Sequence, residues 1–196
     1  MMTTAIRRKA PHHMTVDAFL AWAGDGRWDL VDGEPRAMAP ASATHGIIQA
    51  RSAFMLTQHL QARGRAWLVA TQPPIVPHVR ARSNMRVPDV AVTCSPVDAG
   101  RFALPAPVLI VEIPSPTNEA ETWENVWTYV SIPSVREVLV LRSTTIAAEL
   151  LRRNADGSWP QEPLPLDRDA TLHLDTIGLT CPLAAFYIGT HLARAA

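Results

Sequence analysis

Two hydrophobic periodicities divide the first third of the chain. Apolar residues spaced three and four apart over 15–23 and 45–63 predict two amphipathic helices, the second capped by Ser42 or Thr44. Between the helices, residues 28–34 alternate between apolar and polar side chains and end in Asp-Gly-Glu. Asp-Gly after an alternating run is typical of a tight turn, so a β-hairpin is expected here.

From residue 66 onward, short valine-rich runs bounded by Pro, Gly, Ser or Asp replace the helical pattern. The predicted strands cover residues 66–71, 75–79, 87–94, 108–113, 137–141 and 146–152. A helix is expected over 119–131 and a closing helix over 182–192. This order of elements predicts a mixed α/β fold built around one central sheet.

The composition is that of a globular protein with one domain. The chain has 196 residues, of which 47% are hydrophobic and 18% are charged, too apolar for a disordered chain. We expect residues 1–13 to form a flexible tail and residues 14–196 a single domain. Eighteen basic residues balance 18 acidic ones, so contact with nucleic acid or a membrane would require a local charged patch.

Targeting signals and cysteine usage favour a cytoplasmic protein without a membrane partner. The basic N-terminal segment lacks the apolar stretch of a secretory signal. No window approaches the roughly 20 apolar residues of a membrane-spanning helix. Cys94 and Cys181 are isolated and lack CxxC spacing, so we interpret them as small apolar residues in a reducing compartment.

Two acidic residues interrupt predicted strands that are otherwise apolar. Asp89 lies within the valine-rich run of residues 87–92, and Glu112 lies within that of 108–113. Such uniformly apolar strands are usually buried on both faces. A lone carboxylate there costs several kcal/mol unless it is paired, protonated or bound to a cation.

A divalent cation is one way to balance these two charges. If Asp89 and Glu112 converge at one edge of the sheet, Mg²⁺ (or Mn²⁺) could bind both, with the backbone carbonyl of Ile113 as a further oxygen ligand. Such an ion would lower the pKa of a water molecule and stabilise charge on a phosphate. The alternative is that each acid pairs with an arginine, for which the candidates are Arg80, Arg82 and Arg86.

Four short motifs follow one another along most of the chain. They are Trp-Asp-Leu-Val-Asp-Gly-Glu at 28–34, Val-Pro-Asp-Val-Ala-Val at 87–92, Val-Glu-Ile-Pro-Ser-Pro-Thr at 111–117 and Tyr-x-x-Ile-Pro-Ser-Val-Arg-Glu at 129–137. In this order they resemble the Uma-two family of putative restriction endonucleases. The resemblance implies the PD-(D/E)XK nuclease fold, a restriction-endonuclease-like mixed sheet flanked by helices. It also implies Mg²⁺-dependent hydrolysis of DNA.

The resemblance assigns roles to several residues and shows one difference from the family pattern, at its lysine. Asp89 and Glu112 fall on the two acidic metal ligands. The superfamily also uses a lysine, and the first position for it, two residues after the glutamate, is Pro114. The family's helical motif, D-x-x-x-K-x-x-x-Y, becomes Glu121-x-x-x-Asn125-x-x-x-Tyr129 when one deletion is allowed before it. Asn125 therefore stands where the family has its lysine.

The replacement matters because a neutral amide can orient water but supplies no positive charge. Lys9, the only lysine of the chain, lies in the predicted tail, so no other lysine can take over. His45, where the family also has a histidine, either lines the site or is simply a polar residue of the first helical turn. We therefore predict that His45, Glu121 and Asn125 accompany the two acids in the catalytic site.

Two functions remain open at this point, beside a third interpretation in which the acids only form ion pairs and the protein is a structural component of an oligomer. The first is a metal-dependent DNA endonuclease, acting as a homodimer if it cuts two strands with two subunits. The second is a catalytically degenerate relative that binds nucleic acid or another protein through the same fold.

Overall fold

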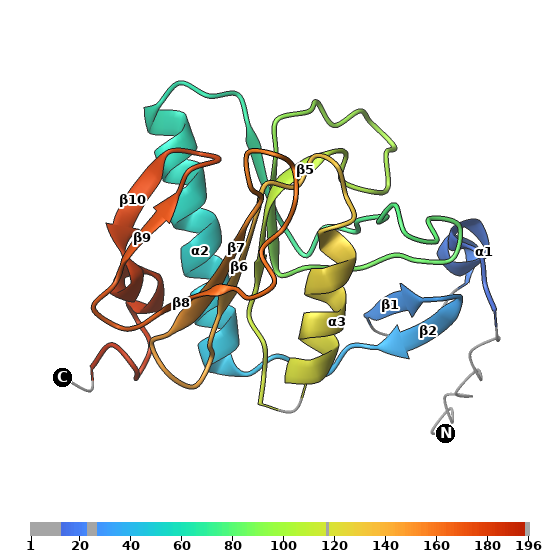
Figure 1. Cartoon of the computed structure of the whole chain (residues 1–196). Coiled ribbons are helices and arrows are strands. Elements are labelled where there is room, and N and C mark those ends of the chain that lie inside the picture. The colour runs from blue at the N-terminus through green and yellow to red at the C-terminus, as the bar shows by residue number, and fades with distance from the viewer. Residues whose placement is uncertain (1–12, 23–26, 117, 195–196) are drawn as a thin grey trace.

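The computed structural model describes residues 13–22, 27–116 and 118–194. The elements are α1 (Val16–Ala21), β1 (Trp28–Val31), β2 (Glu34–Ala37), α2 (Ala43–Ala62), β3 (Leu68–Thr71), β4 (Val90–Thr93), β5 (Pro107–Glu112), α3 (Glu119–Tyr129), β6 (Glu137–Leu141), β7 (Ala148–Arg152), β8 (Leu164–Leu166), β9 (Thr171–Leu174), β10 (Leu179–Pro182) and the 3₁₀ helix η1 (Leu183–Tyr187). Figure 1 shows α2 and the β9–β10 hairpin on one side of the central strands and α3 on the other.

The central sheet has six strands in the order β3-β4-β5-β6-β7-β8. Strands β5 and β6 are parallel, and every other neighbouring pair is antiparallel. Because parallel neighbours need a crossover, the chain between β5 and β6 leaves the sheet and forms α3. The predicted mixed sheet is therefore present, although the hairpins β1–β2 and β9–β10 form two further sheets of their own.

Alternation along the central strands divides the core into two layers. In β4, Val90 and Val92 face the cluster that contains α2, whereas Ala91 faces the cluster that contains α3. In β6, Leu139 and Val138 are divided in the same way. Successive side chains of a strand point to opposite faces, so a strand buried on both sides is apolar throughout, as the sequence predicted.

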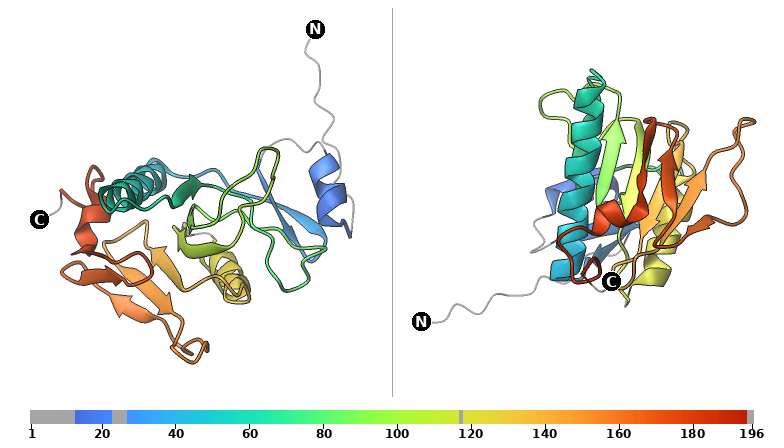
Figure 2. Two further views of the ribbon diagram at one scale, coloured as in Figure 1. Left: turned by 90° about the horizontal axis from the view of Figure 1, so that it is seen from above. Right: turned by 90° about the vertical axis from the view of Figure 1, so that its left-hand side faces the viewer.

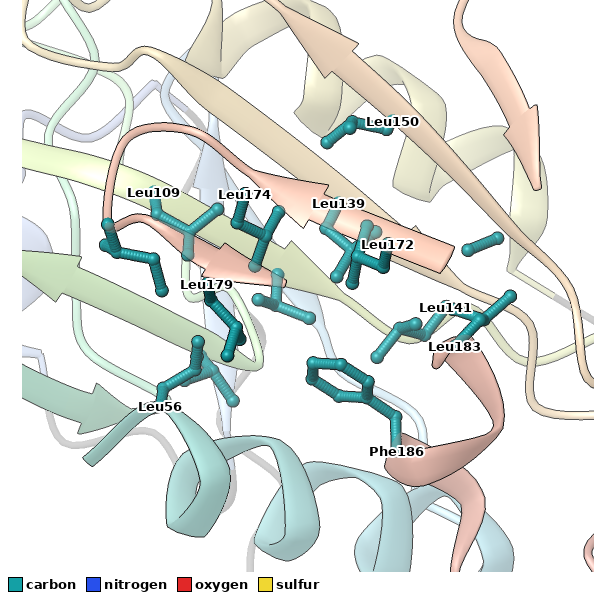
Figure 3. Close-up of a cluster of buried hydrophobic side chains, with 14 of the residues drawn as sticks. Leu56, Leu109, Leu139, Leu141, Leu150, Leu172, Leu174, Leu179, Leu183 and Phe186 are labelled. Atoms are coloured by element: carbon teal, nitrogen blue, oxygen red, sulfur yellow. The ribbon is translucent and has the colours of Figure 1, made fainter. Parts of the chain in front are cut away.

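The larger cluster is closed by the C-terminal part of the chain. In Figure 3, Leu172, Leu174 and Leu179 of the β9–β10 hairpin lie over Leu109 and Leu139 of the sheet, and all five belong to one buried cluster. The hairpin thus completes the cover that α2 begins. Figure 2 shows this hairpin at one end of the molecule and α1 with β1–β2 at the other.

The N-terminal elements follow their sequence signals closely. The β1–β2 turn at Asp32 and Gly33 has φ values of +50° and +87°, which suit the tight turn that Asp-Gly favours. Thr15 caps α1 by accepting from the Ala18 amide. Ser42, rather than Thr44, caps α2. The predicted end of α1 at residue 23 lies outside the described residues.

Two predicted elements are wrong. Residues 75–79 form no strand, and only an isolated bridge joins Ile75 to Arg86. The prolines at 73, 74 and 77 remove amide donors from this segment, so a ladder cannot extend along it. The closing helix predicted over 182–192 is reduced to η1, because β10 extends to Pro182 and Gly189 adopts φ +97° soon after η1 ends.

The strand predicted over 137–141 is confirmed at both ends, and the other boundaries differ by at most three residues. Strands β8, β9 and β10 were not predicted at all. Within the described ranges, no helix combines the length and the apolar character needed to cross a membrane.

Candidate functional site

The pairing of β4 with β5 sets the geometry of the two acidic residues. Val90 lies opposite Val111 in this antiparallel ladder, so the next step outward brings Asp89 opposite Glu112. Opposed residues of an antiparallel pair point to the same face, with their Cβ atoms about 4.5–5.5 Å apart. Glu112 contacts Tyr129 of α3, while Asp89, opposite it at the end of β5, contacts His45 of α2.

Asp89 is held by three polar groups from two elements. His45 Nε2 lies 2.8 Å from Asp89 Oδ1, and the Ile113 amide donates to Oδ2 at 2.8 Å. The Gln49 side chain donates to the backbone oxygen of Asp89 at 2.9 Å. His45 and Gln49 are four residues apart and so share one face of α2. This network fixes the orientation of a carboxylate that is only 7% exposed.

Glu112 is equally buried, and its partners are mostly neutral. The Tyr129 hydroxyl donates to Glu112 Oε1 at 2.7 Å. Burial, together with the charge of Asp89, raises the pKa of Glu112 well above its usual value. Burial and the neighbouring Glu112 likewise raise the pKa of the Tyr129 hydroxyl. A cation beside Glu112 would favour its ionised form.

The arginines considered as partners for these acids bind elsewhere. Among the described residues, no arginine forms an ion pair with Asp89 or Glu112. Arg80 pairs with Asp32 at 2.7 Å. Arg86 is buried and donates to the Leu30 carbonyl. The alternative in which arginines balance the two acids is therefore wrong.

The two acids open into a pocket of about 90 Å³ between the sheet, the start of α2, the β1–β2 hairpin and α3. Its lining includes all the predicted site residues, together with several that were not predicted. The predicted ones are His45, Asp89, Glu112, Ile113, Glu121 and Asn125, and the others include Arg27, Asp29, Arg36, Ser115 and Asn118. The structure thus gathers residues from five separate segments into one cavity.

Asp29 is the most informative of the residues that the sequence analysis missed. Its Oδ1 accepts from the Val87 amide at 2.9 Å, and its Oδ2 accepts from Asn125 Nδ2 at 3.4 Å. Burial raises the pKa of Asp29 to about 6, although the nearby Arg86 acts in the opposite direction. The pocket therefore contains a third carboxyl group, and it is this group, across the pocket, that Asn125 contacts.

The sequence of this chain matches a known protein family along most of its length. The sequence matches the Uma2 family, the Uma-two family of the sequence analysis, over residues 16–184, and this family is described as "Putative restriction endonuclease". The chain belongs to the Uma2 family. The family predicted from the four motifs is therefore confirmed.

The Uma2 protein is also similar to two other proteins. An uncharacterized protein from Synechocystis sp. is 29% identical over 183 residues, which cover 90% of this chain and 92% of that protein. The crystal structure of a putative nuclease from Anabaena variabilis has a TM-score of 0.73 and 16% identity, and it covers 89% of this chain and 97% of its own. At this identity the likeness establishes the fold, which confirms the predicted nuclease-like mixed α/β class.

The carboxylates of Asp89 and Glu112 offer oxygen donors of the kind that Mg²⁺ prefers. Within the described ranges, no three His, Cys, Asp or Glu side chains are arranged to hold a metal. The protein would therefore contribute Asp89 and Glu112 and leave the other positions to water. Mg²⁺ fits such a set, because it is usually bound through one or two carboxylates and keeps several waters.

Some sequence signals could have found the missed residues, and others could not. Tyr129 stood in the helical motif of the Uma2 family, and Gln49 stands four residues after His45. Asp29 gave no such signal, because the alternation of the hairpin directs Leu30 inward and Asp29 away from it. Its burial depends on α3, which contacts it from 96 residues later in the chain.

Proposed function

We propose that this protein is a divalent-cation-dependent endonuclease that hydrolyses phosphodiester bonds in DNA. One observation carries the proposal. Asp89 and Glu112 stand opposite each other at the mouth of a polar pocket, buried and without an arginine partner in the described part of the chain. Family membership adds support, since the Uma2 family is described as putative restriction endonucleases.

The residues that contact the two carboxylates would orient them in such a site. A divalent cation held by the two carboxylates would supply Lewis acidity and lower the pKa of a water molecule. His45 fixes the orientation of the Asp89 carboxylate, and Tyr129 fixes that of Glu112. Such supporting hydrogen bonds typically change metal affinity or activity by about 10–100-fold.

The positive charge for phosphate would come from arginines at the rim of the pocket. Arg36 lines the pocket and pairs with Glu124 at 3.1 Å. Both side chains are exposed, so this pair contributes at most about 1 kcal/mol and leaves Arg36 able to contact a phosphate oxygen. Arg27 lines the same pocket, and no described residue forms an ion pair with it.

Supercoiled-plasmid cleavage tests the proposal. The wild-type protein is expected to convert supercoiled DNA to nicked or linear forms with Mg²⁺ or Mn²⁺ and not with EDTA. Asp89→Asn should abolish this activity, while Asp169→Asn, at an exposed aspartate outside the pocket, should leave it unchanged. Cleavage that survives Asp89→Asn would overturn the assignment of the site.

Asn125 favours a second candidate function, that of a degenerate relative which binds nucleic acid without cutting it. Its amide contacts Asp29 and carries no charge, whereas a lysine there would place an ammonium beside that carboxylate. The variant Asn125→Lys separates the two functions. A faster reaction on top of measurable wild-type cleavage supports the nuclease. Activity that is absent in wild type and present in Asn125→Lys supports the degenerate module.

A further inference from the structure

A second pocket, of about 290 Å³, adjoins the acidic pocket and differs from it in character. Four of its ten lining residues are aromatic: Phe19 and Trp22 come from α1 and the residue that follows it, Trp28 from β1, and Phe102 from the loop between β4 and β5. This volume lies just below the roughly 300–1,000 Å³ of typical small-molecule sites, so the pocket suits a small flat group.

The two pockets share two lining residues. Arg27 and Val87 line both of them, so a basic residue stands between the acidic and the aromatic side. Gln72 adds a polar side chain to the aromatic pocket. A ligand that spans both pockets would therefore contact the carboxylates of the acidic pocket, the positively charged Arg27, and the aromatic rings and Gln72 of the second pocket.

One aromatic side chain of this pocket is unusually accessible. Phe102 is 52% exposed, although phenylalanine is among the residues most often buried. Trp22 and Trp28 pack edge to face, with ring centroids 5.0 Å apart. This contact holds the two indoles in a defined arrangement, and Phe102 supplies the exposed ring.

We propose that the aromatic pocket binds an unpaired base of DNA, next to a phosphate that occupies the acidic pocket. This proposal rests on the proposed function and specifies its substrate. A nucleotide joins a phosphate and a flat base through one sugar, which matches an acidic, cation-binding pocket and an aromatic one joined at an arginine. Every base has a π-face, so stacking on aromatic side chains accepts any sequence.

The proposal has a consequence for substrate choice. A base inside a duplex is stacked and paired, so it reaches the pocket only after it leaves the helix, at a cost of a few kcal/mol. This cost is lowest for mismatched or single-stranded positions. The enzyme should therefore prefer DNA with an unpaired base to fully paired DNA.

Binding of three labelled DNA duplexes tests this preference. One contains a mismatched base pair, one has an abasic position at the same place, and one is fully paired. Fluorescence anisotropy is measured in Ca²⁺ with the wild type, Phe102→Ala and the control Phe54→Ala. Phe54 is 53% exposed on α2 and lines neither pocket, so the control matches Phe102 in residue type and exposure.

The wild type and Phe54→Ala should bind the mismatched duplex about 5–100-fold more tightly than the other two. Phe102→Ala should lose most of this preference and bind the abasic duplex as the wild type does. Equal binding of all three duplexes by wild type and Phe102→Ala, with plasmid cleavage that still depends on Asp89, would overturn the base pocket alone. A Phe102-dependent preference without Asp89-dependent cleavage would support the pocket and overturn the nuclease.

Two other occupants of the pocket give distinct results. Tighter binding of a single-stranded RNA than of the same DNA sequence would overturn DNA as the ligand. If Phe102→Ala instead dissociated a dimer in sedimentation velocity and left DNA binding unchanged, the pocket would hold a second copy of the chain. That outcome also contradicts the proposal.

Discussion

Neighbouring strands of the central sheet each carry a buried glutamate, and the two are stabilised differently. Glu137, at the start of β6, is fully buried, and it accepts from Arg152 Nε at 2.7 Å and from the amides of Asp175 and Thr176. Glu112, at the end of the parallel neighbour β5, has Tyr129 and the opposing acid Asp89 beside it.

The difference separates an acid paired within the protein from one that has no basic partner in the described part of the chain. Burying a carboxylate costs free energy that must be offset by partners. The charge of Glu137 is balanced within the protein. No described basic residue forms an ion pair with Glu112. Burial alone does not distinguish Glu112 from Glu137; the difference lies in their partners.

The largest expected effect concerns catalysis. Glu112→Gln removes a proposed metal ligand, and with it several kcal/mol of charge stabilisation in the transition state. We expect plasmid cleavage to fall about a thousandfold or more, which corresponds to roughly 4 kcal/mol. Glu137→Gln should lower activity only in proportion to the unfolded fraction, as measured by circular dichroism on the same samples. Equal losses of specific activity per folded molecule would erase the distinction between the two acids.

The next effect concerns stability, and here Glu137 is the sensitive residue. Glu137→Gln leaves Arg152 without its buried partner, and removing one member of such a pair typically costs about 3–5 kcal/mol. Because Arg152 is partly exposed, we expect a loss of about 3 kcal/mol in the free energy of unfolding, measured in urea. The exposed acid Glu162 is a control, and Glu162→Gln should change stability by no more than about 0.5 kcal/mol. If Glu137→Gln also lowered the free energy of unfolding by no more than about 0.5 kcal/mol, the ion pair of Glu137 would contribute little to stability.

Asp29 makes stability depend on pH. The pKa of Asp29 is about 6 in the folded protein and 3.8 in the unfolded chain, so the folded state binds more protons between these values. Its contribution to stability is therefore highest below about pH 4, falls as the pH rises towards about 6, and then stays low. Asp29→Asn should remove about 2 kcal/mol of this decline.

Urea unfolding at pH 4 and pH 7 measures this effect as a difference between variant and wild type. Asp98→Asn, at an exposed aspartate outside the acidic pocket, is the matched control and should keep the wild-type decline. A decline in Asp29→Asn as steep as in the wild type would show that another group titrates in this interval.

The smallest expected effect is a gain in stability, whereas most substitutions destabilise a protein. Without divalent cations, Glu112→Gln removes a buried acid whose ionised form is disfavoured, and it keeps an oxygen that can accept from Tyr129. We expect it to stabilise the protein by about 1 kcal/mol, since replacing buried charges is often neutral or stabilising. Thermal unfolding in EDTA measures this change. In excess Mg²⁺, only the wild type should gain stability, because a ligand that binds the folded state raises its unfolding temperature. Destabilisation of Glu112→Gln in EDTA would mean that the glutamate is already satisfied.

The sequence predicted the parts of the fold that depend on local pattern. Alternation and valine content located β4, β5 and β6, and the same regularity made Asp89 and Glu112 stand out. The β8 strand was missed because it is three residues long and contains Pro165. The 75–79 strand was predicted from its apolar residues, whereas its prolines decided the outcome.

The candidate site was predictable where a strand pattern or a family motif marked a residue. Both pointed to Asp89 and Glu112, the family motif alone pointed to His45, Glu121 and Asn125, and all five line the pocket. Asp29 and Arg27 join the pocket through contacts between distant segments, which no local pattern records. Their place depends on how the β1–β2 hairpin packs near α3, a tertiary relation that a single sequence does not reveal.

The parallel pairing of β5 and β6 has a consequence for which substitutions the site can accept during evolution. If these strands were antiparallel, a short hairpin could join them, and no helix would need to cross the acidic end of β5. Because they are parallel, α3 crosses there and carries Asn125 and Tyr129 to the acids. Position 125 is only half-buried and belongs to neither main core cluster. Substitutions there can therefore alter the chemistry of the pocket, by adding or removing a charge, while the sheet and its crossover stay the same.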